Sequence, residues 1–343
     1  MHALVLTSPD RLEYLQVPDP RIGAGDVLVD VRACGICGSD VHGMDGSSGR
    51  RVPPIIMGHE AAGAVCRVGT DVQGWTEGDR VTFDSTIYCG ACRYCRVGRV
   101  NLCDERRVFG VSCKEYRQQG AFADYVAVPA RILYRLPSEV SFVQGAMAEP
   151  LSIALHAVAR AGRQIHSSVV VVGTGLIGLL VIQSLRAEGC EAIIAVDVSE
   201  FRLERARAFG ATTVVRAGSD DVIEAVSELT AGRGADVVFE AVGARATVAS
   251  AVELASKGGH VVLVGNLVPR ADLPLQAAVT RELTLCGSAA SAGEYPAALA
   301  MIADRRVDVD ALVTSVEPLR DGATWLHRLR AGEASLLKVM LAP

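Results

Sequence analysis

Four cysteines lie within fifteen residues of one another and offer the four thiolates of a closed metal site. They are Cys89, Cys92, Cys95 and Cys103, separated by two, two and seven residues. Zinc takes four thiolate ligands in tetrahedral structural sites. The surrounding segment lacks an apolar period, so we expect an irregular loop that its metal orders. Disulfide bonds or chance clustering are the alternatives, and the tight spacing favours zinc.

A second set of residues could hold a reactive metal. Cys37, His59 and Glu149 supply a thiolate, an imidazole and a carboxylate. Catalytic zinc takes three protein ligands and keeps one position open, so two zinc ions with different roles are expected. Each residue also has an ordinary interpretation. Cys37 and His59 could be buried core residues, and Glu149 could precede a helix over 151–160. Spacing alone leaves both interpretations open.

A glycine-rich turn follows an apolar run at 168–172 and precedes an apolar helical pattern. Its glycines, Gly173, Gly175 and Gly178, have the spacing of dinucleotide-binding turns. There they permit a tight turn, a close approach of backbone to the pyrophosphate, and close helix–strand packing. Asp197 would bind the adenosine ribose hydroxyls and disfavour a 2′-phosphate, so NAD is the expected cofactor. A glycine-rich turn in an ordinary α/β domain is the alternative.

Further residues are expected around the nucleotide. Arg202 could pack on the adenine side, or it could be a solvated charge on a helix face. The remaining members of the expected nucleotide site are small or apolar: Leu176, Ile177, Val242, Val264 and Gly265.

The second half of the chain alternates strand and helix patterns, which predicts parallel strands joined by right-handed crossovers in a doubly wound α/β sheet. The expected strands cover 168–172, 192–197, 213–215, 235–239, 260–264 and 283–286. The expected helices cover 176–188, 199–208, 220–230 and 244–256.

The first part of the chain reads differently. Glycine, proline and short alternating runs, such as 27–31 and 80–83, predict a mostly β domain with functional loops. We therefore expect a catalytic domain over 1–145 with both zinc sites, and a dinucleotide-binding domain over 146–288. A segment over 289–343 would return to the first domain.

Composition excludes several classes of function. Net charge is -5, half of the residues are hydrophobic, and no basic run suggests nucleic acid. The longest apolar stretch, 169–182, is interrupted and too short to cross a membrane. No signal peptide is evident, and the other cysteines are scattered, which favours a reducing cytoplasm.

The motif Gly58-His59-Glu60, followed by Gly63, Gly69 and Val72, resembles the signature of the zinc-containing medium-chain dehydrogenases. The cysteine quartet resembles the structural-zinc lobe of that family, and the order of motifs matches over essentially the whole chain. The resemblance implies a GroES-like catalytic domain, a Rossmann-type domain that binds NAD, two zinc ions per chain, and a homotetramer or homodimer.

The resemblance also implies particular roles. Cys37, His59 and Glu149 would bind the catalytic zinc, with Glu60 as an alternate ligand and Asp40 orienting the imidazole. Two further catalytic residues would move the proton of an alcohol substrate. Ser39 would hydrogen-bond the substrate hydroxyl, and His42 would finish a proton path that runs through the nicotinamide ribose to solvent.

Resemblance is greatest to the sorbitol or L-iditol dehydrogenase branch, which implies oxidation of a secondary alcohol or polyol to a ketone. That branch usually carries Tyr where this chain has Gly43. It also tends to carry Arg in the segment that corresponds to 287–291, where this chain has none. These departures predict a roomier and less polar substrate pocket. A threonine dehydrogenase is the neighbouring alternative, although that branch typically has His where this chain has Thr86.

Two alternatives come from other classes. A non-enzymatic protein that binds zinc and a nucleotide could use the cysteine loop to contact nucleic acid or a partner. A zinc-free reductase could have the same fold, and it would not need the Cys37, His59 and Glu149 set.

Overall fold

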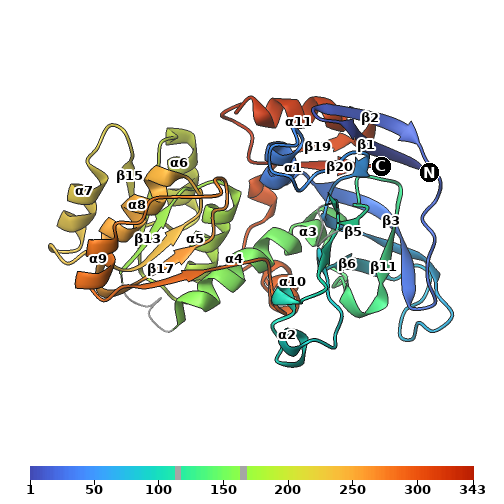
Figure 1. The fold of residues 1–343 in the computed structure, drawn as a ribbon, viewed down its shortest axis with the longest axis horizontal. Coiled ribbons are helices and arrows are strands. Elements are labelled where there is room, and N and C mark those ends of the chain that lie inside the picture. The colour runs from blue at the N-terminus through green and yellow to red at the C-terminus, as the bar shows by residue number, and fades with distance from the viewer. Residues whose placement is uncertain (113–116, 163–167) are drawn as a thin grey trace. The chain divides into compact units, whose positions relative to one another are not determined.

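The computed structural model describes residues 1–112, 117–162 and 168–343. It divides into two compact units (Figure 1). The first consists of Met1–Ser152 together with Ser291–Pro343, and the second of Ile153–Ala290. Among the described residues, none of the helices combines the length and apolarity that crossing a bilayer requires.

The first unit is built on a seven-stranded sheet with the order β12-β6-β5-β3-β20-β19, and β11 also pairs with β3. Val27, Val29 and Val31 of β3 lie two residues apart on one face of the strand and pack into the core, as the pattern at 27–31 predicts. The strands are β3 (Asp26–Gly35), β5 (Glu60–Val68), β6 (Arg80–Phe83), β11 (Tyr125–Pro129), β12 (Leu133–Arg135), β19 (Val313–Pro318) and β20 (Lys338–Ala342).

The C-terminal strand is the link between distant parts of the first unit. β20 pairs antiparallel with β3, with Met340 opposite Gly35 and Leu341 opposite Cys34. A separate three-stranded sheet joins β2 (Arg11–Gln16), β1 (His2–Ser8) and β4 (Ile55–Ile56). Four two-residue strands complete the unit: β7 (Thr86–Ile87), β8 (Arg107–Val108), β9 (Val111–Ser112) and β10 (Arg117–Gln118).

Helices of the first unit are mostly short. They are α1 (Gly38–Gly43), α2 (Arg93–Arg96), α3 (Phe142–Ala146), α10 (Tyr295–Ala303) and α11 (Gly322–Arg330). A longer helix, α4 (Ala148–Ala161), begins in the first unit and continues into the second. The expected helix over 151–160 begins earlier, at Ala148, so Glu149 and Pro150 lie inside its first turn. Proline is tolerated there because the first backbone N–H groups of a helix have no intrahelical acceptor.

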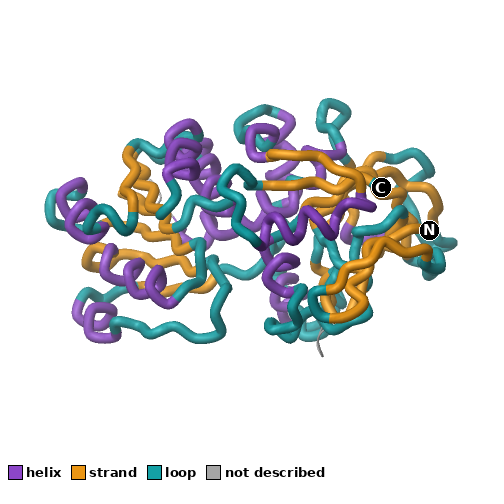
Figure 2. The backbone as a smooth tube through the Cα atoms, turned by 90° about the horizontal axis from the view of Figure 1, so that it is seen from above, coloured by secondary structure: helices purple, strands orange, loops and turns teal. Residues whose placement is uncertain are grey.

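The second unit is a six-stranded sheet whose strands are parallel, as the sequence predicts, and their order is β15-β14-β13-β16-β17-β18. Figure 2 shows its strands in orange with purple helices on both sides. The strands are β13 (Ser168–Val172), β14 (Ala192–Asp197), β15 (Thr213–Arg216), β16 (Ala235–Glu240), β17 (Ala255–Leu263) and β18 (Thr284–Gly287). The helices are α5 (Leu176–Ala187), α6 (Glu200–Ala208), α7 (Val222–Leu229), α8 (Arg245–Leu254) and α9 (Leu275–Thr280).

The largest difference from the predicted boundaries in this unit is at β17; the other predicted elements differ by at most two residues at their ends. β17 begins at Ala255 rather than at residue 260, and α8 ends at Leu254. The added residues include Lys257 and two glycines and carry no apolar alternation, which hides the strand from the sequence pattern. Strand order reverses on the two sides of β13, between β14 and β16, which is where dinucleotides bind in sheets of this type.

Candidate metal centres and nucleotide cradle

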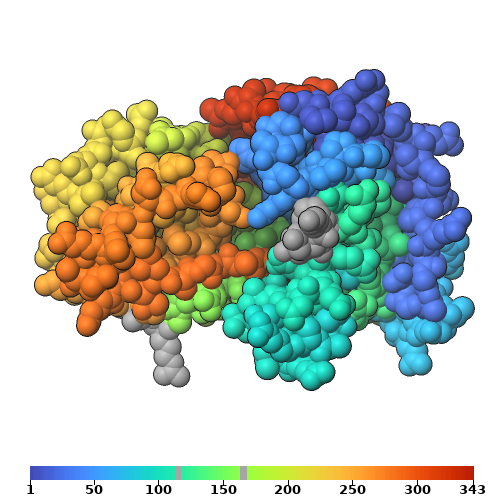
Figure 3. Space-filling view, in the orientation of Figure 1, coloured from blue at the N-terminus to red at the C-terminus, as the bar shows by residue number. Residues whose placement is uncertain are grey.

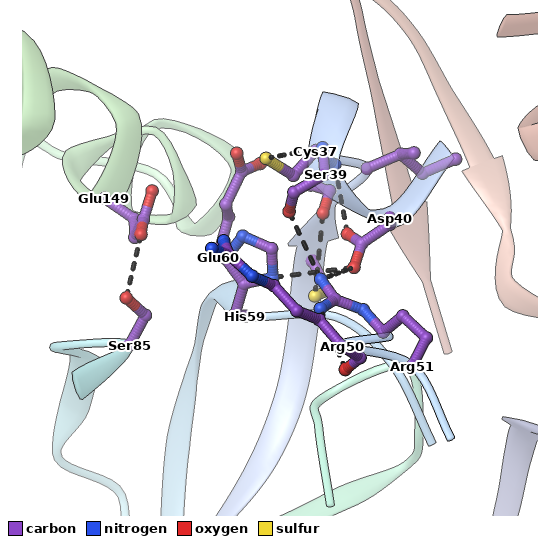
Figure 4. A network of polar contacts seen from close by, with 12 residues as sticks. Cys37, Ser39, Asp40, Arg50, Arg51, His59, Glu60, Ser85 and Glu149 are labelled. Carbon is purple, nitrogen blue, oxygen red and sulfur yellow. Dashed lines mark hydrogen bonds and ion pairs between the residues drawn. The ribbon is translucent and has the colours of Figure 1, made fainter. Parts of the chain in front are cut away.

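The reactive cluster forms where two antiparallel strands meet. Cys37 follows β3, whereas His59 and Glu60 lie at the start of β5. Gly35 is paired directly with Glu60, so the ends of the two strands coincide. One ligand atom from each of Cys37, His59 and Glu60 lies within 4.8 Å of the others (Figure 4).

Glu149 approaches this cluster from the first turn of α4 (Figure 4). One carboxylate oxygen accepts a hydrogen bond from Ser85 Oγ at 2.9 Å. The other oxygen, Oε2, is buried and has no hydrogen-bond partner. Burial raises the pKa of Glu149 to about 8; His59 opposes this shift, whereas the negative charges of Glu60 and Cys37 add to it.

Cys37, His59 and Glu60 fit a divalent cation such as zinc, whereas Glu149 lies outside the group whose ligand atoms are all within 4.8 Å of one another. Burial, together with the charges of Glu60 and Asp40, raises the pKa of Cys37 to about 11. Buried anionic groups this close together repel one another, and a cation among them removes that cost. The donor set is also of the right kind, since zinc accepts sulfur, nitrogen and carboxylate oxygen.

Lys338 is a member of this region that the sequence analysis missed. It lies at the start of β20, is 1% exposed, and forms a buried ion pair with Glu60 Oε2. Its Nζ also donates to the Ile36 carbonyl oxygen at 2.9 Å. Gly35 makes this possible, because a Cβ there would overlap the Glu60 carboxylate. The one signal in the sequence was a lysine inside the apolar run 336–341.

Helix α1 carries the residues expected to move a proton. Cys37 is its N-cap, and the Cys37 sulfur accepts from the backbone N–H of Ser39 at 3.4 Å. Ser39 and His42 are both exposed, and three residues apart on a helix they share one face. Their side chains therefore lie on the same open side of α1, next to the cluster.

Asp40 is buried on the other side of α1, between the His59 imidazole and the Arg51 guanidinium. Its Oδ1 lies 3.6 Å from His59 Nδ1 and 3.0 Å from Arg51 Nη2. Burial by itself would raise the pKa of Asp40, but the charges of His59 and Arg51 outweigh it and leave the pKa below its usual value. Arg51 was also missed, because nothing in the pattern of its segment marks a buried arginine.

The cysteine quartet has the dimensions of a tetrahedral thiolate site. The Cys92 and Cys95 sulfurs are 3.5 Å apart, and those of Cys89 and Cys95 are 4.0 Å apart. Four sulfurs bound to zinc at about 2.3 Å would be separated by about 3.8 Å. Backbone N–H groups also point at sulfur, for example from Cys89 to Cys103 at 3.2 Å. The quartet therefore fits zinc.

An irregular loop was predicted for the segment that carries the quartet, but part of the segment is helical. It contains α2 and a turn of 3₁₀ helix, η1 (Val100–Leu102). Elements of three or four residues are too short to produce a periodic pattern. Around α2 the segment protrudes from the first unit (Figures 1 and 3).

In the second unit, the three glycines of the β13–α5 turn have different surroundings. Gly173 adopts a φ of +89°, which favours glycine. A Cβ at Gly178 would overlap the carbonyl oxygen of Gly173, whereas a Cβ at Gly175 would meet no atom within 4 Å. Open space beside a backbone N–H at the start of α5 is what a pyrophosphate needs.

Asp197 ends β14 and holds two turns together. One carboxylate oxygen accepts from Thr174 N–H at 2.7 Å, and the other accepts from Ser199 N–H at 2.9 Å. Arg202 Nη1 lies 3.9 Å from the same carboxylate, so this arginine is not an isolated surface charge. The carboxylate therefore links the glycine-rich turn to the start of α6.

The remaining expected nucleotide residues lie at the ends of β16 and β17. Glu240, which sequence reasoning missed, is fully buried and its carboxylate accepts from Val242 N–H at 3.0 Å. Its backbone oxygen accepts from Val264 N–H at 2.8 Å and from Gly265 N–H at 2.9 Å. Glu240 is thus hydrogen-bonded to the turn after β16 and to the turn after β17. Leu176 and Ile177 begin α5 and are half-buried.

Comparison with known proteins places this architecture in context. The family models for the alcohol dehydrogenase GroES-like domain and for zinc-binding dehydrogenases match residues 23–138 and 177–304. D-xylulose reductase A of Aspergillus oryzae is 35% identical over 99% of this chain and 96% of its own length. Sorbitol dehydrogenase of Bacillus subtilis is 32% identical over 100% of this chain and 97% of its own.

A solved structure from Sinorhizobium meliloti 1021, a zinc-binding dehydrogenase bound to NADP by its description, is similar along the whole chain. It superimposes with a TM-score of 0.90 at 32% identity, covering 100% of this chain and 99% of that one.

The glycine-rich turn yields a prediction about stability. Gly178→Ala should lower the free energy of unfolding by about 1–3 kcal/mol, because the new methyl group must displace backbone. Gly175→Ala is the matched control and should leave stability nearly unchanged, since its Cβ meets open space. Urea unfolding of the three proteins checks this. Equal stabilities for the two variants would contradict the packing described here.

Metal content is the second prediction. Protein purified without chelator should carry about two zinc ions per chain by elemental analysis. Cys37→Ala should remove about one of them and leave the fold intact. Cys95→Ser should instead lower the thermal unfolding temperature, because its segment depends on the metal for order. A Cys95→Ser protein of unchanged thermal stability would mean that the quartet is not a structural site.

Proposed function

Because this chain belongs to the family of zinc-binding alcohol dehydrogenases, we propose that it uses zinc and NAD to oxidise a secondary alcohol or polyol to a ketone. The observation that carries this proposal is the Cys37, His59 and Glu60 cluster next to the exposed Ser39 on α1. Zinc would supply Lewis acidity toward the substrate hydroxyl, and the nicotinamide would accept a hydride.

Cys37, His59 and Glu149 are the proposed metal ligands. Two carboxylates compete for the third position, and their partners differ. Glu60 Oε2 is engaged by the buried Lys338, whereas Glu149 Oε2 has no partner. The free oxygen makes Glu149 the better permanent ligand, and Glu60 remains the alternate one. Asp40 faces His59 Nδ1, which leaves Nε2 for the metal.

Ser39 and His42 would move the substrate proton. The Ser39 hydroxyl accepts the alcohol proton while it gives up its own, and His42 receives the proton further along the exposed face of α1. Removing that proton increases the electron density on the substrate oxygen, which favours loss of a hydride from the neighbouring carbon.

The substrate class rests on relatives and on what this chain lacks. The two relatives named above are a xylulose reductase and a sorbitol dehydrogenase. This chain has Gly43 and two alanines within 287–291, so it offers fewer polar groups for extra hydroxyls. Oxidation of threonine is the second candidate, and Thr86 in place of a histidine counts against it.

NADH formation with polyols, diols, simple secondary alcohols and threonine tests the alternatives; threonine as the best substrate would overturn the proposal.

We also propose a homotetramer or homodimer that works in the cytoplasm on a small-molecule alcohol, without nucleic-acid or membrane partners. A net charge of -5 gives no attraction to polyanions. Light scattering gives the subunit number. Retention on DNA at low salt would contradict the absence of a nucleic-acid partner.

Cofactor choice is the third prediction. A 2′-phosphate beside the Asp197 carboxylate should cost about 1–4 kcal/mol per like charge at about 4 Å, or roughly a factor of ten to a thousand in binding. Wild type should therefore prefer NAD over NADP, and Asp197→Ser should reduce the preference. Glu200→Gln, an exposed neighbour on α6, is the control and should not alter it. Steady-state kinetics with both cofactors decides; equal efficiencies for wild type would contradict the assigned role of Asp197.

The proton path gives the fourth prediction. Ser39→Ala should lower kcat by about 10²–10⁴-fold, because the alcohol proton loses its first acceptor. His42→Ala should have a smaller effect, and added imidazole buffer should restore part of the rate, since water and buffer can replace an exposed relay group. Turnover measured at several buffer concentrations checks both. Wild-type rates in the two variants would remove this path from the mechanism.

A further inference from the structure

A buried arginine touches the proton path. Arg51 lies between α1 and β4, and its side chain is 3% exposed. Its Nη2 donates to Ser39 Oγ at 3.2 Å and to Asp40 Oδ1 at 3.0 Å (Figure 4). Its Nη1 reaches the Arg50 carbonyl oxygen at 3.5 Å, and its Nε is buried without a partner. Burying a guanidinium is costly, and Asp40 offsets that cost.

Gly43 provides the room for this arginine. A Cβ at Gly43 would lie 2.8 Å from Arg51 Cγ and 3.3 Å from Ser48 Oγ. The absence of a side chain at residue 43 therefore leaves a space that the stem of Arg51 fills. The space beside Gly43 thus holds a cation that lies next to Ser39.

The contact limits what the Ser39 hydroxyl can do. A serine hydroxyl has one donor and two acceptor positions, whereas a guanidinium has donors only and stays protonated. In this structure Arg51 therefore occupies one acceptor position of Ser39 Oγ. One acceptor and one donor remain, which are the two that a proton relay needs: one to receive the alcohol proton and one to pass a proton on.

We propose that Arg51 is a positioning residue for this relay: it fixes the direction of the Ser39 hydroxyl and stabilises the negative charge that grows on Oγ during the transfer. This inference rests on the proposed function. In the step, the alcohol O–H bond breaks as a new Oγ–H bond forms, and the original Oγ–H bond breaks as its proton leaves along the path to His42. Ser39 ends neutral, as it began.

A purely structural role is the competing explanation. Arg51 also neutralises Asp40, which faces His59, so its loss could act on the metal cluster instead. The two routes differ in one respect. An effect through Ser39 must vanish once the Ser39 hydroxyl is absent, whereas an effect through Asp40 and His59 must persist.

The test is a double-mutant cycle in the zinc-loaded enzyme. A hydrogen bond from a charged group contributes about 1.5–3 kcal/mol, so Arg51→Met should lower kcat by about ten- to a hundredfold with a smaller change in KM. The same substitution in a Ser39→Ala background should lower kcat by less than about twofold. Arg51→Lys should recover part of the rate. Arg50→Gln removes an exposed neighbouring charge and should match wild type.

Two measurements do not depend on turnover. Zinc content should stay the same in Arg51→Met, and the unfolding midpoints of the four proteins of the cycle should be non-additive, because Arg51 and Ser39 touch. Should Arg51→Met fail to fold, Gly43→Ala serves in its place, since its Cβ pushes the arginine stem away from Ser39.

Three results would overturn the inference: an undiminished effect of Arg51→Met in the Ser39→Ala background, loss of zinc from Arg51→Met, or wild-type kcat in Arg51→Met. Failure of the proposed function looks different. In that case wild type itself would form no NADH with any alcohol tested, and the cycle in unfolding midpoints would still report whether Arg51 and Ser39 interact.

Discussion

The pairing of β3 with β5 on one side and with β20 on the other is the constraint on which the reactive region depends. It aligns Gly35 with Glu60 and with Met340, so residues from three distant parts of the chain share one strand end. Gly35 is the centre of this arrangement, because only a residue without a side chain leaves room for the Glu60 carboxylate to reach Lys338. The close packing at Gly35 therefore also determines the buried ion pair between Glu60 and Lys338.

The charges around that strand end are arranged in pairs. Arg51 balances Asp40, and Lys338 balances Glu60, each within a buried ion pair. Glu149 and Cys37 have no such fixed cation, and the pKa of each is raised by burial and by neighbouring negative charges. The protein thus neutralises Asp40 and Glu60 but leaves Glu149 and Cys37 without a paired cation, and a metal bound there would neutralise them.

Sequence patterns predicted what depends on local spacing. The cysteine quartet, the glycine-rich turn and the parallel strands were all visible, because each is a property of a short window. Arg51, Lys338 and Glu240 were not, since their importance comes from burial against residues far away in the chain. The start of α4 was predicted too late, because a proline such as Pro150 often marks a helix boundary. Proline is nevertheless tolerated in the first turn of a helix, and Pro150 lies there. A buried charge has no periodic signature, so only the fold reveals it.

The discontinuity of the first unit has a consequence for biosynthesis. Lys338 and its strand follow the whole of the second unit, Ile153–Ala290, in the order in which the ribosome makes the chain. Before the second unit has been made, the nascent first unit therefore lacks β20, one of the strands that pair with β3, and Glu60 lacks its buried cation. The ion pair between Glu60 and Lys338 can therefore form only after the second unit has been translated in full.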